Sequence, residues 1–139
     1  MHIKDWINRI SKSQELLGGY SVCPYAKNAQ YEIVNTNGRN ITAPTGDFEL
    51  VIYVLPDDYS QIKVEEIAQE YNLLYKELVF LPDPKDRYTE INGVQTNNGK
   101  QNLILCQPRA KLTEARERLA KTEYYSYWDE NYLQEILDT

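Results

Sequence analysis

The sequence predicts an α+β fold with a ferredoxin-like two-layer sandwich at its centre. Three apolar runs, at 49–55, 76–81 and 102–106, are typical of buried strands. A helical pattern lies between the first and second runs, and another follows the third. The resulting order, β-α-β-β-α over 48–122, is that of a ferredoxin-like core, with a thioredoxin-like α/β fold as the alternative.

Length and composition indicate a single domain that folds without disulfide bonds or a structural metal. The chain has 139 residues, of which 42% are hydrophobic and 26% charged, as in ordinary globular proteins. A chain of this length can bury a core without disulfides or a structural metal. Its two cysteines, Cys23 and Cys106, form no disulfide framework, and we expect both to be free thiols.

Charge and hydropathy limit the classes of partner. The net charge of −6 disfavours nucleic acid and anionic membranes. No apolar run approaches the ~20 residues that span a bilayer, and no signal-peptide core follows the amphipathic N-terminus. We therefore expect a cytoplasmic protein that binds a small molecule or another protein, with no membrane partner. Its 12 tyrosines against 2 phenylalanines suit half-buried positions and binding surfaces.

The N-terminal elements are expected to lie outside the core. Apolar side chains recur every three or four residues over 3–17, which predicts an amphipathic helix that ends at Gly18-Gly19. Alternation over 31–34 predicts a strand, and the Asn37-Gly38 turn signal predicts that it returns as a hairpin through 40–42. The fourth strand of the sandwich would come from this hairpin or from the later aromatic run.

Two helices complete the core. Asp58 and Gln61 have the spacing of a capping box, which predicts a helix from there to Leu74. The second helix is expected over 112–122, where oppositely charged residues recur at i,i+4. The segments outside the core are 1–47, with a helix, a cysteine segment and the hairpin, and 123–139, with the aromatic run 124–128 and a last helix.

The connection at 82–100 is polar and rich in turn signals. Asn92-Gly93 and Asn98-Gly99 are both pairs that favour tight hairpin turns, because asparagine and glycine tolerate a positive φ. The stretch is therefore expected to contain a short β-excursion rather than a structureless loop.

Cys23 is the candidate catalytic residue. Pro24 suits the first position of a helix that Cys23 would cap, and the helix dipole together with Lys27 would favour the thiolate. The run Cys23-Pro24-Tyr25-Ala26 resembles the glutaredoxin active site Cys-Pro-Tyr-Cys, with Ala26 in place of the second cysteine. The resemblance implies a monothiol that acts through mixed disulfides. The alternative is a small buried cysteine with a packing role.

A basic segment is the candidate anion site. Five cationic residues over 109–121 lead into the aromatic run 124–128, and cations beside aromatic rings can bind a nucleotide or another anion. The alternative is a solvated helix face whose cations pair with glutamates. The candidate ligand-binding residues are Tyr25, Tyr88, Gln107, Arg109, Lys111 and Arg116.

Acidic residues follow two of the predicted strands. Parallel strands end at one edge of a sheet, where ligands usually bind, and carboxylate oxygens suit Mg²⁺ or Ca²⁺. The alternative is that these residues cap a helix and solvate turns. No motif requires a cofactor or metal, and the weak candidates for a cation are Asp57, Asp58, Asp83 and Asp86.

The leading functional hypothesis is a non-enzymatic domain that binds a ligand or protein partner, with a homodimer through its aromatic surface as one form. The first alternative is a thiol-dependent oxidoreductase or transferase with Cys23 as nucleophile and Lys27 assisting. The second is a regulatory nucleotide- or anion-binding module that uses the basic 109–121 helix.

Overall fold

The computed structural model describes residues 2–23, 29–128 and 130–137. The chain divides into two compact units, and each is described by itself. The sheet unit comprises Gln30–Arg87 and Asn98–Thr113; the terminal unit comprises Met1–Ala29, Tyr88–Asn97 and Glu114–Thr139. In the described part of the chain, no helix has the length and apolar character needed to cross a membrane.

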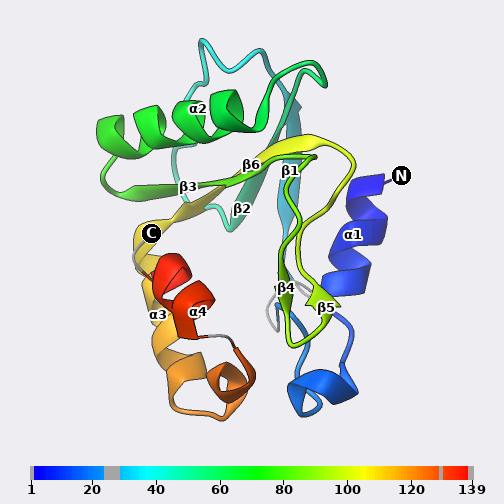
Figure 1. Ribbon diagram of the computed structural model, residues 1–139. Coiled ribbons are helices and arrows are strands. Elements are labelled where there is room, and N and C mark those ends of the chain that lie inside the picture. Colours follow the sequence, from blue (N-terminus) through cyan, green and yellow to red (C-terminus); the bar gives the residue numbers. More distant parts are fainter. Residues whose placement is uncertain (1, 24–28, 129, 138–139) are drawn as a thin grey trace. The chain divides into compact units, whose positions relative to one another are not determined.

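A four-stranded mixed sheet forms the sheet unit, which confirms the predicted α+β class. The central strand β6 is antiparallel to β2 on one side and to β3 on the other, so β2 and β3 are parallel without being neighbours. Helix α2 joins them and packs on β3 and β6 (Figure 1). The elements, in sheet order and then the helix, are β1 (Tyr31–Asn35), β2 (Leu50–Leu55), β6 (Asn102–Pro108), β3 (Leu78–Asp83) and α2 (Gln61–Leu74).

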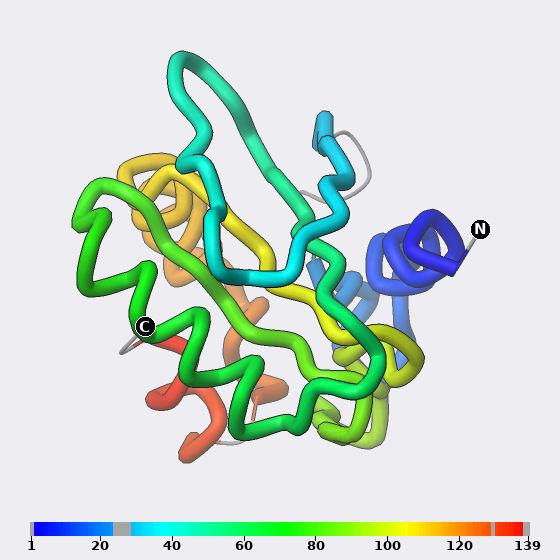
Figure 2. The backbone as a smooth tube through the Cα atoms, turned by 90° about the horizontal axis from the view of Figure 1, so that it is seen from above, coloured from blue at the N-terminus to red at the C-terminus, as the bar shows by residue number. Residues whose placement is uncertain are grey.

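The edge strand β1 differs from the prediction. It pairs with β2 in parallel, whereas residues 40–42 form no returning strand, so the predicted hairpin is wrong. Residues 36–49 instead make a long irregular connection, the cyan and teal loop of Figure 2. A ferredoxin-like sandwich takes its fourth strand after the second helix, and β1 precedes the whole β-α-β-β-α run. The edge strand therefore departs from the ferredoxin-like order.

Tyrosine hydroxyls explain why this connection does not fold back on β1. The Tyr71 hydroxyl accepts from the amide of Ile41 at 3.0 Å and donates to the carbonyl of Gly38. The hydroxyls of Tyr53 and Tyr59 donate to two further carbonyls of the connection, at Thr42 and Asn37. Backbone groups that a hairpin would pair with β1 are thus satisfied by side chains from β2, α2 and the turn before α2.

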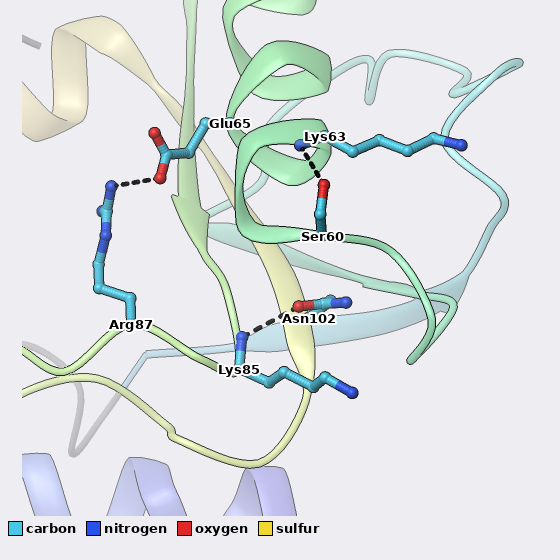
Figure 3. A network of polar contacts seen from close by, with 6 residues as sticks. All are labelled: Ser60, Lys63, Glu65, Lys85, Arg87 and Asn102. Carbon is cyan, nitrogen blue, oxygen red and sulfur yellow. Dashed lines mark hydrogen bonds and ion pairs between the residues drawn. The ribbon is translucent and has the colours of Figure 1, made fainter.

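The core between α2 and the sheet follows the predicted periodicity. Val64, Ala68 and Tyr71 of α2 are buried, and the ring of Tyr71 lies 5.5 Å from that of Phe80 on β3. The helix begins later than predicted, because the Ser60 hydroxyl, and not Asp58, accepts from the amide of Lys63 at 3.2 Å (Figure 3). The end at Leu74 is confirmed.

A side chain also satisfies backbone groups on the outer edge of β3. The amide of Asn72 on α2 donates to the Phe80 carbonyl at 2.8 Å, and its oxygen accepts from the Phe80 amide at 2.7 Å. Two positions further on, Pro82 has no amide hydrogen to present. Exposed edges with free backbone groups recruit foreign strands, and Asn72 and Pro82 remove such groups from this one.

In the terminal unit, the first helix is shorter than predicted. Helix α1 (His2–Ile10) ends where the carbonyl of Ile10 accepts from the amide of Cys23 at 2.9 Å. A separate 3-10 turn, η1 (Glu15–Leu17), then leads to Gly18, which has the left-handed φ of 64° expected of a terminating glycine. The 3–17 helix is therefore split by a long-range contact that periodicity does not reveal.

The other elements of the terminal unit match the turn and helix signals in part. Asn92 and Gly93 have φ values of 48° and 87° and join β4 (Glu90–Ile91) to β5 (Val94–Gln95), as predicted. Asn98-Gly99 makes no hairpin, since the Asn98 side chain accepts from the amides that follow it. The remaining elements are α3 (Arg109–Ala120), η2 (Tyr124–Tyr127) and α4 (Glu130–Leu137). Helix α3 begins before the predicted residue 112, and its residues belong to both units.

Asn72→Ala is expected to lower the free energy of unfolding by about 1–3 kcal/mol, because the buried amide and carbonyl of Phe80 lose their partner. Urea denaturation measures the change. Leu73→Ala is the matched control on the same helix: Leu73 is 64% exposed, and its removal should change the value by less than about 0.5 kcal/mol. Equal losses in the two variants would show that the Asn72 cap contributes nothing.

Candidate functional site

Only part of the predicted thiol site lies among the described residues. Cys23 is half-buried, and its amide donates to the Ile10 carbonyl. Pro24, Tyr25, Ala26 and Lys27 lie outside the described residues, so the activation of Cys23 by a helix turn and by Lys27 stays a prediction.

The second thiol is sequestered in the core of the sheet unit. Cys106 on β6 is buried beside Tyr53 and Phe80. Burial raises the pKa of the Cys106 thiol to about 12, so this group remains neutral near neutral pH. A neutral thiol is a poor nucleophile, which gives Cys106 a packing role and leaves Cys23 as the reactive candidate.

Two cations of the basic segment, Arg109 and Lys111, are engaged within the sheet unit. The Arg109 guanidinium donates to the carbonyls of Lys76, at 3.0 Å, and Leu78. Lys111 pairs with Asp47, and its hydrogen bond and positive charge lower the pKa of that carboxyl. These two cations anchor the start of α3 to the sheet unit, while Gln107 and Arg116 are half-buried. Anion binding by this segment stays a prediction.

At the carboxyl edge of the sheet, amides accompany the acidic residues. Asp83 is buried and accepts from the side-chain amide of Asn98 at 2.9 Å. Asp57, Asp58 and Asp86 are exposed. In residues 2–23, 29–128 and 130–137, no group of three or more histidines, cysteines and acidic residues is placed to hold a metal ion.

The terminal unit contains a pocket whose described lining includes none of the predicted site residues. It is an open hollow of about 660 Å³ between the β4–β5 turn and the aromatic run with α4. The Asn92-Gly93 signal and the aromatic run both marked these segments, but neither signal indicates that they meet. The lining residues are Glu90, Asn92, Ser126, Tyr127, Trp128 and Tyr132.

Aromatic rings surround Trp128 in this unit. Its ring centroid lies 5.4 Å from that of Tyr132, and the rings of Tyr125 and Tyr124 lie at 5.2 and 5.5 Å. Tyr125 meets Trp128 edge-on at 73°, a geometry that aromatic pairs favour. The Tyr132 hydroxyl is further held by the Thr96 hydroxyl at 3.4 Å. Packing from several sides therefore fixes the wall of the pocket formed by Trp128 and Tyr132.

The two tryptophans of the chain differ in their hydrogen bonding. Trp6 on α1 donates from Nε1 to the Thr96 carbonyl at 3.1 Å. Trp128 has a buried Nε1 with no acceptor among the described residues. An unsatisfied buried donor costs about 1–3 kcal/mol, and such groups are rare in folded proteins. The lining residue Trp128 thus carries a donor that none of the described residues accepts from.

Glu90 gives the pocket its charge. It is the only charged residue among the described residues that line the pocket. The Tyr88 hydroxyl donates to Glu90 Oε2 at 3.0 Å, and this bond raises the pKa of Tyr88. Tyr88 was predicted to contact a small anion, but its hydroxyl donates to the Glu90 carboxylate instead. The negative charge of Glu90 would also repel an anionic ligand.

Comparison with protein-family models, with curated proteins and with solved structures found no match. The functional argument therefore rests on the residues of the chain and on their geometry.

Alkylation of the native protein is expected to modify Cys23. Cys106 should stay unmodified at any pH below the pKa of its own thiol. Denaturation should expose a second thiol per chain, which mass spectrometry counts. The Cys23→Ser variant should incorporate no label in its native state. Native labelling at Cys106 would contradict its placement in the core.

Proposed function

We propose that this protein binds a small molecule in the pocket between the β4–β5 turn and the aromatic residues that precede and begin α4. The volume, about 660 Å³, falls within the range of about 300–1,000 Å³ typical of small-molecule sites. Aromatic rings form one part of its described lining and polar side chains the other, so the pocket is more polar than most small-molecule sites. The pocket supports the ligand-binding form of the leading hypothesis over its homodimer form.

The observation that carries the proposal is the buried Nε1 of Trp128. Within the described residues it has no acceptor, although Trp6 satisfies the same group through Thr96. Because this atom is buried, a ligand oxygen would reach it only after a shift of the Trp128 ring, and the new hydrogen bond would then remove the free-energy penalty of the donor. Part of the binding free energy would therefore come from completing a hydrogen bond that folding leaves unmade.

The position of Tyr127 in the wall depends on Gly18. A β-carbon on Gly18 would lie 2.5 Å from Cε2 of the Tyr127 ring, closer than non-bonded carbons approach. Gly18 also has a φ of 64°, which favours glycine. The ring of Tyr127 thus occupies space that a side chain at residue 18 would take.

Proton–nitrogen correlation spectra test the proposal, because the chain has two tryptophans and thus two indole N–H signals. Four probes are titrated: choline, its neutral isostere with carbon in place of nitrogen, the tert-butylacetate anion, and phenol. At least one probe is expected to shift the Trp128 signal saturably while the Trp6 signal stays in place. Equal shifts at both tryptophans, or no saturable shift at Trp128 with any probe, would refute the proposed site.

Gly18→Ala should weaken binding of whichever probe binds the unmodified protein, because the Tyr127 ring must move. Gly19→Ala is the matched control. Gly19 has a φ of 87°, but a β-carbon there meets no atom within 4 Å. Both variants should lose about 1–2 kcal/mol of stability through backbone strain, and only Gly18→Ala should lose affinity. Equal affinities in the two variants would exclude Tyr127 from the binding wall.

A further inference from the structure

We infer that the ligand of this pocket is an organic cation of the alkylated-ammonium class, because Glu90 is placed beside the aromatic rings of Tyr127, Trp128 and Tyr132 in one lining. The inference rests on the proposed function and names the chemistry of its ligand.

The aromatic wall provides the first part of the argument. The faces of aromatic rings carry negative potential and attract cations, and tryptophan does so most strongly. Trp128 and Tyr132 lie 5.4 Å apart with their planes inclined at 38°, so the two rings do not stack flat on one another. Alkylated ammonium groups suit such a wall, because their methyl groups make apolar contact while their charge is only weakly hydrated.

The second part is charge complementarity. Among the lining residues that the structure describes, Glu90 supplies the only charge, and its sign is negative. The Tyr88 hydroxyl holds Oε2 of Glu90 at 3.0 Å, which limits the orientations of the carboxylate. The net charge of −6 adds a field that attracts cations and repels anions. An anionic ligand would face unfavourable like-charge contact in this pocket.

The neutral polar groups define the rest of the ligand. Trp128 Nε1 can only donate, so a ligand group that reached this buried atom would have to be an acceptor, such as a hydroxyl, ether or carbonyl oxygen. The side-chain amide of Asn92 donates to the Leu16 carbonyl at 2.6 Å, which holds the turn in place. The chemistry that fits is therefore a small ammonium compound that also carries an oxygen.

Choline and its neutral isostere separate charge from shape, because they differ in one atom of the same size. Titration is followed at the Trp128 indole signal, with Trp6 as internal reference. Choline is expected to bind about tenfold more tightly than the isostere, through cation–π attraction together with the Glu90 carboxylate. The tert-butylacetate anion should bind more weakly than either.

Two substitutions assign this preference to the pocket. Glu90→Gln should lower choline affinity about threefold to fivefold and leave the isostere unchanged. Glu123→Gln removes the same charge from an exposed residue that does not line the pocket, and it should leave both affinities unchanged. Tyr127→Leu removes one aromatic face and should reduce the advantage of choline over the isostere, with little effect on the isostere itself.

The outcomes distinguish this inference from the proposed function. Equal or tighter binding of the isostere, the anion or phenol would overturn the cation inference while the pocket remained a binding site. Equal losses in Glu90→Gln and Glu123→Gln would show that overall charge, and not Glu90, attracts choline. A titration with choline up to about 10 mM would reveal a Kd of about 1 mM. The absence of a saturable shift over that range would also overturn the inference. Absence of binding by all four probes would overturn both.

Discussion

The side chain of Asn102 joins the segments on which the sheet unit depends. It is 1% exposed at the start of β6, and its amide donates to the carbonyls of Pro56 and Tyr59 at 2.9 and 3.0 Å. Its oxygen accepts from the amide of Lys85 at 3.0 Å (Figure 3). Those partners follow β2 and β3, so one buried residue ties the ends of two parallel strands to the strand between them. Loss of this side chain would leave several buried polar groups unsatisfied at once.

Side-chain hydrogen bonds to irregular backbone recur through the rest of the chain. Tyrosine hydroxyls hold the 36–49 connection, and the Tyr124 hydroxyl donates to the Val22 carbonyl in the terminal unit. Phenylalanine would fill the same space without satisfying these groups. Backbone groups outside regular strands and helices therefore account for the choice of tyrosine at Tyr53, Tyr59, Tyr71 and Tyr124.

The aromatic run of the terminal unit contributes both to packing and to the lining of the pocket. Tyr124 is buried and packs edge-on against Tyr20, with ring centroids 5.7 Å apart. Burial, together with the neighbouring Cys23, raises the pKa of Tyr124, so this phenol stays neutral and keeps its donor. Tyr127 and Trp128, which follow it directly, line the pocket. A 3-10 turn over Tyr124–Tyr127 thus directs neighbouring aromatic side chains to the core and to the pocket.

Local patterns determined the strands β2, β3 and β6, the helix α2 and the turn at Asn92-Gly93. Each depends on residues that are close in the sequence: apolar periodicity for the strands and the helix, and tolerance of a positive φ for the turn. Only the tertiary structure decided that β1 pairs in parallel with β2 and that α1 ends at Ile10. It alone brought the β4–β5 turn to Trp128 and left the Nε1 of that residue without an acceptor among the described residues. These features depend on contacts between distant segments, and no local periodicity encodes which distant backbone or side-chain group will be the partner.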